Sequence, residues 1–127
     1  MPSSVRSTSL RRADLAPPAR TLVDILAVTV DAHADDLAID TGEEVLTYRQ
    51  MWDAAGAVAS DLYAAGVRTG DRVGIRMSTG RPDLHVAIVG ILRAGAAYVP
   101  VDADDPEERA TVVFGEADVA AVITDDG

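Results

Sequence analysis

Apolar and polar residues alternate along the chain at two periods, which predict helices and short strands in turn. Residues 21–34 repeat apolar side chains at a helical spacing, and Thr21 with Asp24 has the form of a helix-capping box. The predicted apolar stripe of this helix consists of Leu22, Ile25, Leu26 and Val30. Residues 37–48 then hold two apolar runs around Gly42, a pattern typical of a β-hairpin with glycine in its turn.

A second helix is predicted from Thr47 to Gly66. Thr47 and Gln50 have the spacing of a capping box, and Gly66 is suited to end the helix in a left-handed conformation. The predicted buried stripe consists of Met51, Ala55, Val58 and Leu62. Residues 71–77 follow as a buried strand because Val73, Ile75 and Met77 alternate with other residues.

A third helix is predicted from Pro82, in its first turn, to Gly95 at its end. Its core-facing residues are Leu84, Ile88, Ile91 and Leu92. Residues 96–99 are expected to form a short strand that ends at Pro100, since proline has no amide hydrogen to donate to a ladder.

A fourth helix and a last strand complete the pattern. We expect Asp104 or Asp105 to cap this helix and Pro106 to lie in its first turn. The predicted buried stripe consists of Ala110, Val113, Phe114 and Ala117, and residues 120–124 are predicted to form the last strand.

The alternation of strands and helices predicts an α/β fold, with a parallel or mixed sheet covered by helices through right-handed crossovers. The sequence stops at Gly127, directly after a predicted strand, so we expect an incomplete domain, the N-terminal portion of a larger one. Residues 1–20 are rich in Arg, Ser and Pro and are predicted to form a disordered leader; an organelle transit peptide has a similar composition. The domain itself is expected over residues 21–127.

Composition narrows the possible functions. The 127 residues have 48% apolar content. The absence of cysteine excludes thiolate chemistry within these residues, and the net charge of −10 disfavours nucleic-acid binding. All eleven basic residues are arginine, so no lysine is available to bind phosphate or form a Schiff base. No apolar run approaches the roughly 20 residues that span a bilayer. We expect a cytoplasmic protein without membrane contact.

Two loops are candidate ligand sites. The acids Asp102, Asp104 and Asp105 follow a predicted strand, where α/β folds often bind ligands, so they could hold magnesium; capping and solvation explain them equally. The loop 78–83 could cradle an anion with Ser78, Thr79, Gly80 and its amides, but it has neither phosphate-binding fingerprint. We expect an ordinary capped loop, with no metal or cofactor site.

The remaining side chains that could take part in catalysis or ligand binding are expected to have structural roles. His33 and His85 lie on separate segments with no recognisable serine and acid, and surface positions explain them. Trp52 and Tyr63 lie on the second predicted helix, where packing is the common role. No catalytic residue is predicted.

Two stretches resemble a known family. Residues 46–75, LTYRQMWDAAGAVASDLYAAGVRTGDRVGI, resemble the first core motif of amino-acid adenylation domains of nonribosomal peptide synthetases and the helix and strand after it. Residues 91–109, ILRAGAAYVPVDADDPEER, resemble the second core motif, in which Arg93 stands where lysine is usual. The resemblance runs from about residue 21 to the end. The acidic VDADDPEER and the later VFGEA resemble, in particular, synthetases that make amino-acid homopolymers.

The resemblance implies a parent enzyme that uses ATP and Mg to form an aminoacyl adenylate. The aminoacyl group then passes to the phosphopantetheine thiol of a carrier-protein domain. The phosphate loop, ribose-binding aspartate, substrate pocket and C-terminal lysine of the family are absent from these residues, so we expect this chain alone to be inactive. Its expected partners are the rest of the adenylation domain, the carrier domain and the amino acid. An acyl-CoA synthetase or other adenylate-forming ligase, and a non-catalytic interaction module, stay open as alternatives.

Overall fold

A computed structural model describes residues 22–78 and 81–125 of the chain. In chain order the elements are α2 (Leu22–His33), β1 (Leu37–Asp40), β2 (Val45–Thr47), α3 (Tyr48–Ala64), β3 (Arg72–Met77), α4 (Pro82–Arg93), β4 (Ala97–Asp102), α5 (Glu107–Ala117) and β5 (Ala121–Thr124). The predicted leader 1–20 and the predicted capping box at Thr21 lie outside the described residues.

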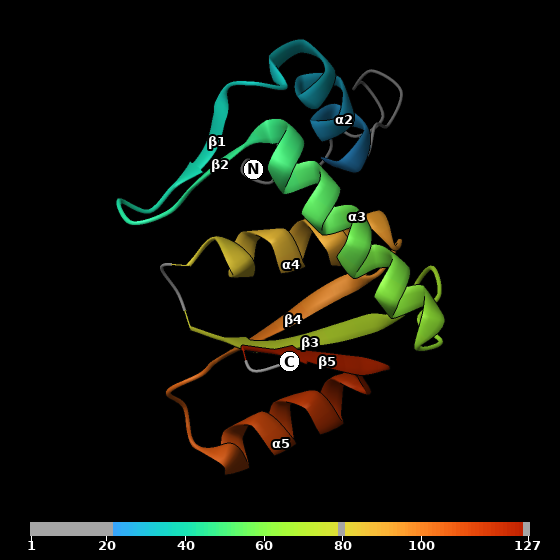
Figure 1. Ribbon diagram of the computed structural model, residues 1–127. Helices are drawn as coiled ribbons and strands as arrows, with labels where there is room; N and C mark the ends of the chain where they lie inside the picture. The colour runs from blue at the N-terminus through green and yellow to red at the C-terminus, as the bar shows by residue number, and fades with distance from the viewer. Residues whose placement is uncertain (1–21, 79–80, 126–127) are drawn as a thin grey trace, which may run out of the picture.

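A three-stranded parallel sheet forms the centre of the fold. Its strand order is β4-β3-β5, and Ile75 lies opposite both Pro100 and Ile123. Figure 1 shows α3 and α4 on one face of this sheet and α5 on the other, with α2 and the β1–β2 hairpin beyond α3 and α4. The predicted α/β class, with a parallel sheet covered by helices, is confirmed.

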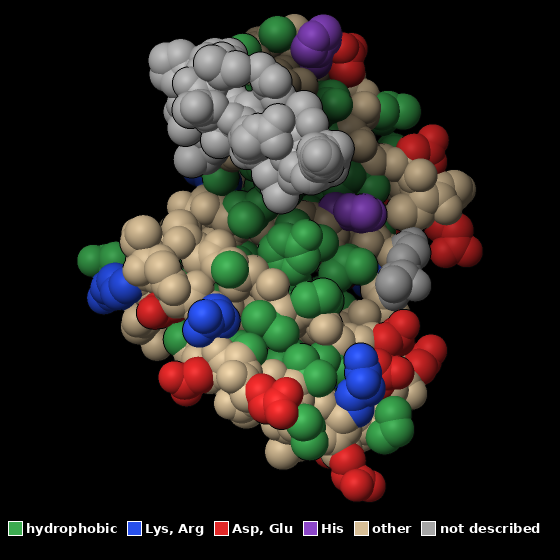
Figure 2. Space-filling model, turned by 180° about the vertical axis from the view of Figure 1, so that it is seen from behind, with side chains coloured by type: hydrophobic (Ala, Val, Ile, Leu, Met, Phe, Trp, Pro, Cys, Tyr) green, Lys and Arg blue, Asp and Glu red, His purple; other side chains and the backbone are tan. Residues whose placement is uncertain are grey.

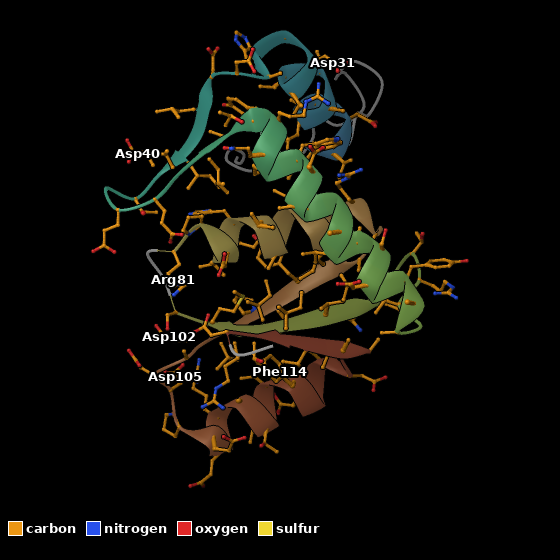
Figure 3. The ribbon with its side chains drawn as sticks, in the orientation of Figure 1. Asp31, Asp40, Arg81, Asp102, Asp105 and Phe114 are labelled. Atoms are coloured by element: carbon orange, nitrogen blue, oxygen red, sulfur yellow. The ribbon has the colours of Figure 1, made fainter. Side chains whose placement is uncertain are left out.

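The main core lies between β3 and the two helices on one face of the sheet. Ile75 of β3 and Ile91 of α4 are almost fully buried, and Leu62 of α3 packs in the same cluster. On the other face, Phe114 of α5 lies over Gly74, where a Cβ atom would come within 2.6 Å of the ring (Figure 3). Gly74 therefore allows α5 to approach the sheet closely.

Several local predictions are confirmed atom by atom. The Gln50 amide donates to Thr47 Oγ1 at 3.1 Å, and the Thr47 amide donates to Gln50 Oε1 at 2.9 Å, so α3 begins with a complete capping box. Gly66 has a φ of 101° after α3, and Gly95 a φ of 82° after α4. Gly42 has a φ of 91° in the turn of the antiparallel β1–β2 hairpin.

The prediction that Pro100 ends a strand of residues 96–99 is wrong, because β4 continues to Asp102. The Ala97 amide donates to Asp71 O at 2.9 Å, towards the side of β3. Alternate residues of a parallel strand turn their amides to opposite sides, so the nitrogen of Pro100 faces the open edge. Proline therefore costs the ladder no hydrogen bond at this position.

The predicted start of α5 is also wrong in detail. Pro106 occupies the N-cap position rather than the first turn, and no side chain caps the helix. The Asp105 carboxylate pairs with Arg109 Nε at 3.1 Å, while Asp102 Oδ1 accepts a hydrogen bond from the Asp104 amide at 2.9 Å. The acids of this loop are therefore used in local contacts instead of a cap.

The stripe predicted for α2 holds for only half of its residues. Val30 is buried, and Leu26 packs against a second core cluster around Met51. Leu22 and Ile25 are 69% and 48% exposed, so the prediction that they face the core is wrong. Helical spacing correctly placed these four residues on one face of α2. It did not predict which part of that face is covered by the rest of the protein.

Candidate functional site

The carboxyl ends of the three parallel strands lie at one side of the sheet, the usual place for a ligand in an α/β fold. Ser78 follows β3, Asp102 ends β4 and Asp125 follows β5. Figure 3 shows Arg81, Asp102 and Asp105 on this side of the molecule, and Figure 2 shows acidic side chains gathered there. We call this side the carboxyl edge.

The loop 78–83, the candidate anion site, begins at Ser78, which is bonded to a carboxylate of the same chain. The Ser78 amide and hydroxyl both donate to Asp125 Oδ2, each at 2.9 Å, so the amide expected to face an anion already has an acceptor. Arg81, at the N-cap of α4, makes no capping bond and forms an exposed ion pair with Asp83 at 3.1 Å. Thr79 and Gly80 lie outside the described residues.

Arg76 connects the sheet to the acidic loop, a contact that sequence reasoning missed. Its Nη1 donates to Glu107 Oε1 at 2.9 Å and its Nη2 to Asp105 O at 2.7 Å. The arginine of a strand thereby holds the start of α5. The sequence indicates this contact only by placing a charged residue within a predicted buried strand, and it does not indicate which residues Arg76 would contact.

The described residues of this edge do not bring together the groups that bind a metal or a nucleotide. Within residues 22–78 and 81–125, no group of three or more acidic or histidine side chains is placed to hold a metal ion. Phosphate groups need cations or free amides, whereas here the Ser78 amide and the Arg76 guanidinium already contact acceptors of the chain. The described residues thus do not by themselves present a site for ATP with magnesium.

Within the described residues, neither histidine forms an ion pair with an acid of the carboxyl edge. His33 Nδ1 lies 2.8 Å from Asp36 Oδ2, and both side chains are more than half exposed. His85 is exposed on α4, where it borders a cavity of about 410 Å³ between α2, the hairpin, α3 and α4. Apolar residues such as Leu26 and Met51 line much of this cavity.

Trp52 and Tyr63 of α3 are each stacked against an arginine. The Arg93 guanidinium lies 4.0 Å from the Trp52 ring centroid and donates to Trp52 O at 2.8 Å, which joins α4 to α3. Arg68 lies 3.8 Å from the centroid of Tyr63, whose side chain is exposed. Arginine can stack and donate in one geometry, which gives Arg93 a structural role at the position where lysine is usual in the motif.

The fold and the second core motif together define an α/β domain of an adenylate-forming kind, and comparison with known proteins agrees. The model of the AMP-binding enzyme family matches residues 26–127. The chain belongs to this family and corresponds to the N-terminal part of an adenylation domain of nonribosomal peptide synthetases.

Two similar proteins show how small a part of its relatives the chain represents. A plipastatin synthase component of Bacillus subtilis is 32% identical over 111 residues, 87% of this chain and 4% of its own. The anguibactin system regulator of Vibrio anguillarum is 35% identical over 120 residues, 94% of this chain and 11% of its own. The chain thus spans about a tenth or less of these relatives.

Solved structures match the fold as well as the sequence. The nonribosomal peptide synthetase FmoA3 superposes with a TM-score of 0.80 at 32% identity, over 86% of this chain and 12% of its own. The N-terminal subdomain of Klebsiella oxytoca NpsA, solved with 3-hydroxyanthranilyl-AMSN, superposes with a TM-score of 0.77 at 26% identity, over 85% of this chain and 28% of its own. None of the described helices is both long and apolar enough to cross a bilayer.

Proposed function

We propose that this chain is the N-terminal scaffold of an enzyme that activates an amino acid with ATP and magnesium. The reaction joins the amino-acid carboxylate to the α-phosphate of ATP and releases pyrophosphate. The aminoacyl group then passes from the adenylate to the phosphopantetheine thiol of a carrier domain. Such an enzyme belongs in the cytoplasm, where ATP and carrier proteins are available.

The family match over residues 26–127 carries this proposal. Several similar proteins are named as synthases of plipastatin, linear gramicidin and bacitracin, and a solved Klebsiella oxytoca protein joins NpsA to a carrier domain in an artificial fusion. The similarity to the synthases of plipastatin and linear gramicidin supports a peptide-synthetase parent over an acyl-CoA synthetase. A homopolymer-making synthetase stays a prediction, based on the acidic second motif alone.

The chemistry itself is proposed to need residues beyond this chain. The charge that develops during phosphoryl transfer is stabilised by cations and magnesium. The chain has no lysine, and its described carboxyl edge is acidic with its Ser78 amide already bonded to Asp125. Residues 22–125 therefore serve as scaffold rather than as catalyst.

Amino-acid-dependent ATP–pyrophosphate exchange tests the proposal. We expect no exchange by the 127-residue chain with any of the standard amino acids. Exchange should appear with the polypeptide obtained by following the reading frame past Gly127. Exchange by the purified chain alone would contradict the scaffold role; a long polypeptide that activates only fatty acids would favour an acyl-CoA synthetase. A reading frame that stops at Gly127 would favour the interaction module.

A further inference from the structure

Two arginine–aromatic stacks lie along one face of α3. The Arg93 guanidinium lies 4.0 Å from the ring centroid of Trp52, and that of Arg68 lies 3.8 Å from the centroid of Tyr63. The two rings are about three helical turns apart, or about 16 Å along the axis. Tryptophan, tyrosine and arginine are the residue types that most often supply binding energy at protein interfaces. We call this surface the outer face of α3, formed by Trp52, Gly56, Ala59, Ser60 and Tyr63.

A groove lined mainly by small residues includes one member of each stack. Its volume is about 440 Å³, and its lining consists of Gly56, Ala59, Ser60, Tyr63, Arg93 and Ala94. Small side chains let a second helix approach α3 closely. An extended strand would gain less here, because the backbone groups in the middle of a helix are already bonded to one another. The groove therefore favours a helix as its occupant.

The charge beside this groove is opposite in sign to that of the whole molecule. None of the described residues that line the groove is acidic. Arg68 and Arg93 form no ion pair within the described part of the chain, and their guanidinium groups contact only aromatic rings and backbone oxygens. Three other described arginines do pair with acids of the chain: Arg76, Arg81 and Arg109. Two cations held in place by stacking thus remain available to carboxylates from outside.

We propose that the outer face of α3 docks an acidic helix of a partner domain. The helix carries carboxylates about three turns apart, which pair with Arg93 and Arg68, and aliphatic side chains between them, which fill the groove. Stacking uses the face of a guanidinium and leaves N–H groups at its edge to bind a carboxylate. A second copy of this chain is a poorer occupant, because its net charge of −10 opposes self-association.

Tryptophan fluorescence tests the site directly, because Trp52 is the only tryptophan in the sequence. The probe is the acetylated and amidated helical peptide AQEAQALAQLAAQEAQA, whose two glutamates lie three turns apart on the face that carries both leucines. The matched control, AQKAQALAQLAAQKAQA, has lysine in place of each glutamate. Each peptide is titrated into the chain at about 10 mM sodium chloride, where screening of charges is weak. Circular dichroism measures the helix content of both peptides.

We expect the glutamate peptide to half-saturate the change in Trp52 emission at a concentration at least about tenfold lower than the lysine peptide. The net charge of the molecule favours the lysine peptide, so a preference for glutamate identifies a local cationic site. Ser60→Glu adds a carboxylate to the groove and should raise the half-saturating concentration of the glutamate peptide at least about fivefold. Thr111→Glu adds the same charge at an exposed position of α5 and should raise it less than about twofold.

Three results would overturn the proposal. Trp52 emission that the glutamate peptide does not change, or that both helical peptides change equally, would show that the face does not select an acidic helix. Equal weakening by Ser60→Glu and Thr111→Glu would place the bound peptide outside the groove. Emission that changes with the concentration of the chain alone would assign the face to a second copy. The peptide comparison uses the unmodified chain and needs neither ATP nor an amino acid, so the proposed function is tested separately.

Discussion

At the scale of single residues, Arg93 joins two helices through both its charge and its shape. Its guanidinium stacks on Trp52 while Nη1 donates to Trp52 O. Lysine has no planar group with which to do both. We expect Arg93→Ala to lower the free energy of unfolding by about 1–2 kcal/mol, and Arg93→Lys by about half as much. Urea unfolding followed by circular dichroism measures both changes.

Arg49→Ala is the matched control for the loss of a guanidinium. Arg49 lies on the exposed face of α3. Its replacement should change the unfolding free energy by no more than about 0.5 kcal/mol. If Arg49→Ala and Arg93→Ala lowered the free energy of unfolding equally, the contact of Arg93 with Trp52 would not contribute to stability beyond an exposed arginine.

At the scale of the elements, the packing of α3 against α4 depends on a glycine. A Cβ atom on Gly90 of α4 would lie 2.6 Å from Val58 Cβ and 3.0 Å from Ala55 O. A Cβ atom on Gly115 of α5 would meet no atom within 4 Å. Both glycines are in helices, where alanine is intrinsically preferred by about 1 kcal/mol. The same substitution should therefore have opposite effects at the two positions.

We expect Gly115→Ala to raise the free energy of unfolding by about 0.5–1 kcal/mol, since it gains helix propensity without a clash. Gly90→Ala should lower it by about 1–3 kcal/mol, because the two helices must separate to admit a methyl group. Paired urea titrations compare the two variants with the parent chain. A stabilising Gly90→Ala would show that α3 and α4 can move apart at little cost.

At the scale of the whole molecule, a large negative charge coexists with exposed apolar side chains. Leu22 and Ile25 of α2 are 69% and 48% exposed, and the net charge is −10. Screening shortens the range of charge repulsion from about 30 Å at 0.01 M salt to about 3 Å at 1 M. We expect a monomer at about 10 mM sodium chloride and association at about 1 M, measured by multi-angle light scattering.

The double variant Leu22→Ser with Ile25→Ser provides the control for this association. It should reduce the mass observed at high salt towards that of the monomer, because the apolar contact surface is smaller. A parent chain that stays monomeric at every salt concentration would contradict the prediction. Association unchanged in the double variant would place the contact elsewhere than α2.

The sequence by itself determined the local features whose causes lie within a few residues. The capping box of Thr47 and Gln50 depends on two side chains of one turn, and the ends of α3 and α4 depend on Gly66 and Gly95 at positive φ. The alternation around Ile75 predicted a buried strand in the same way. The order of the core motifs also predicted the family, because it is a property of the sequence itself.

Only the tertiary structure decided the features that depend on which groups meet in space. Pro100 remains within β4 because β4 lies at the edge of the described sheet, and strand order cannot be deduced from the residues around a proline. Ser78 and Asp125 are 47 residues apart in sequence and meet because β3 and β5 are neighbours. Such contacts arise from the packing of whole elements, which combines many weak interactions that no local pattern contains.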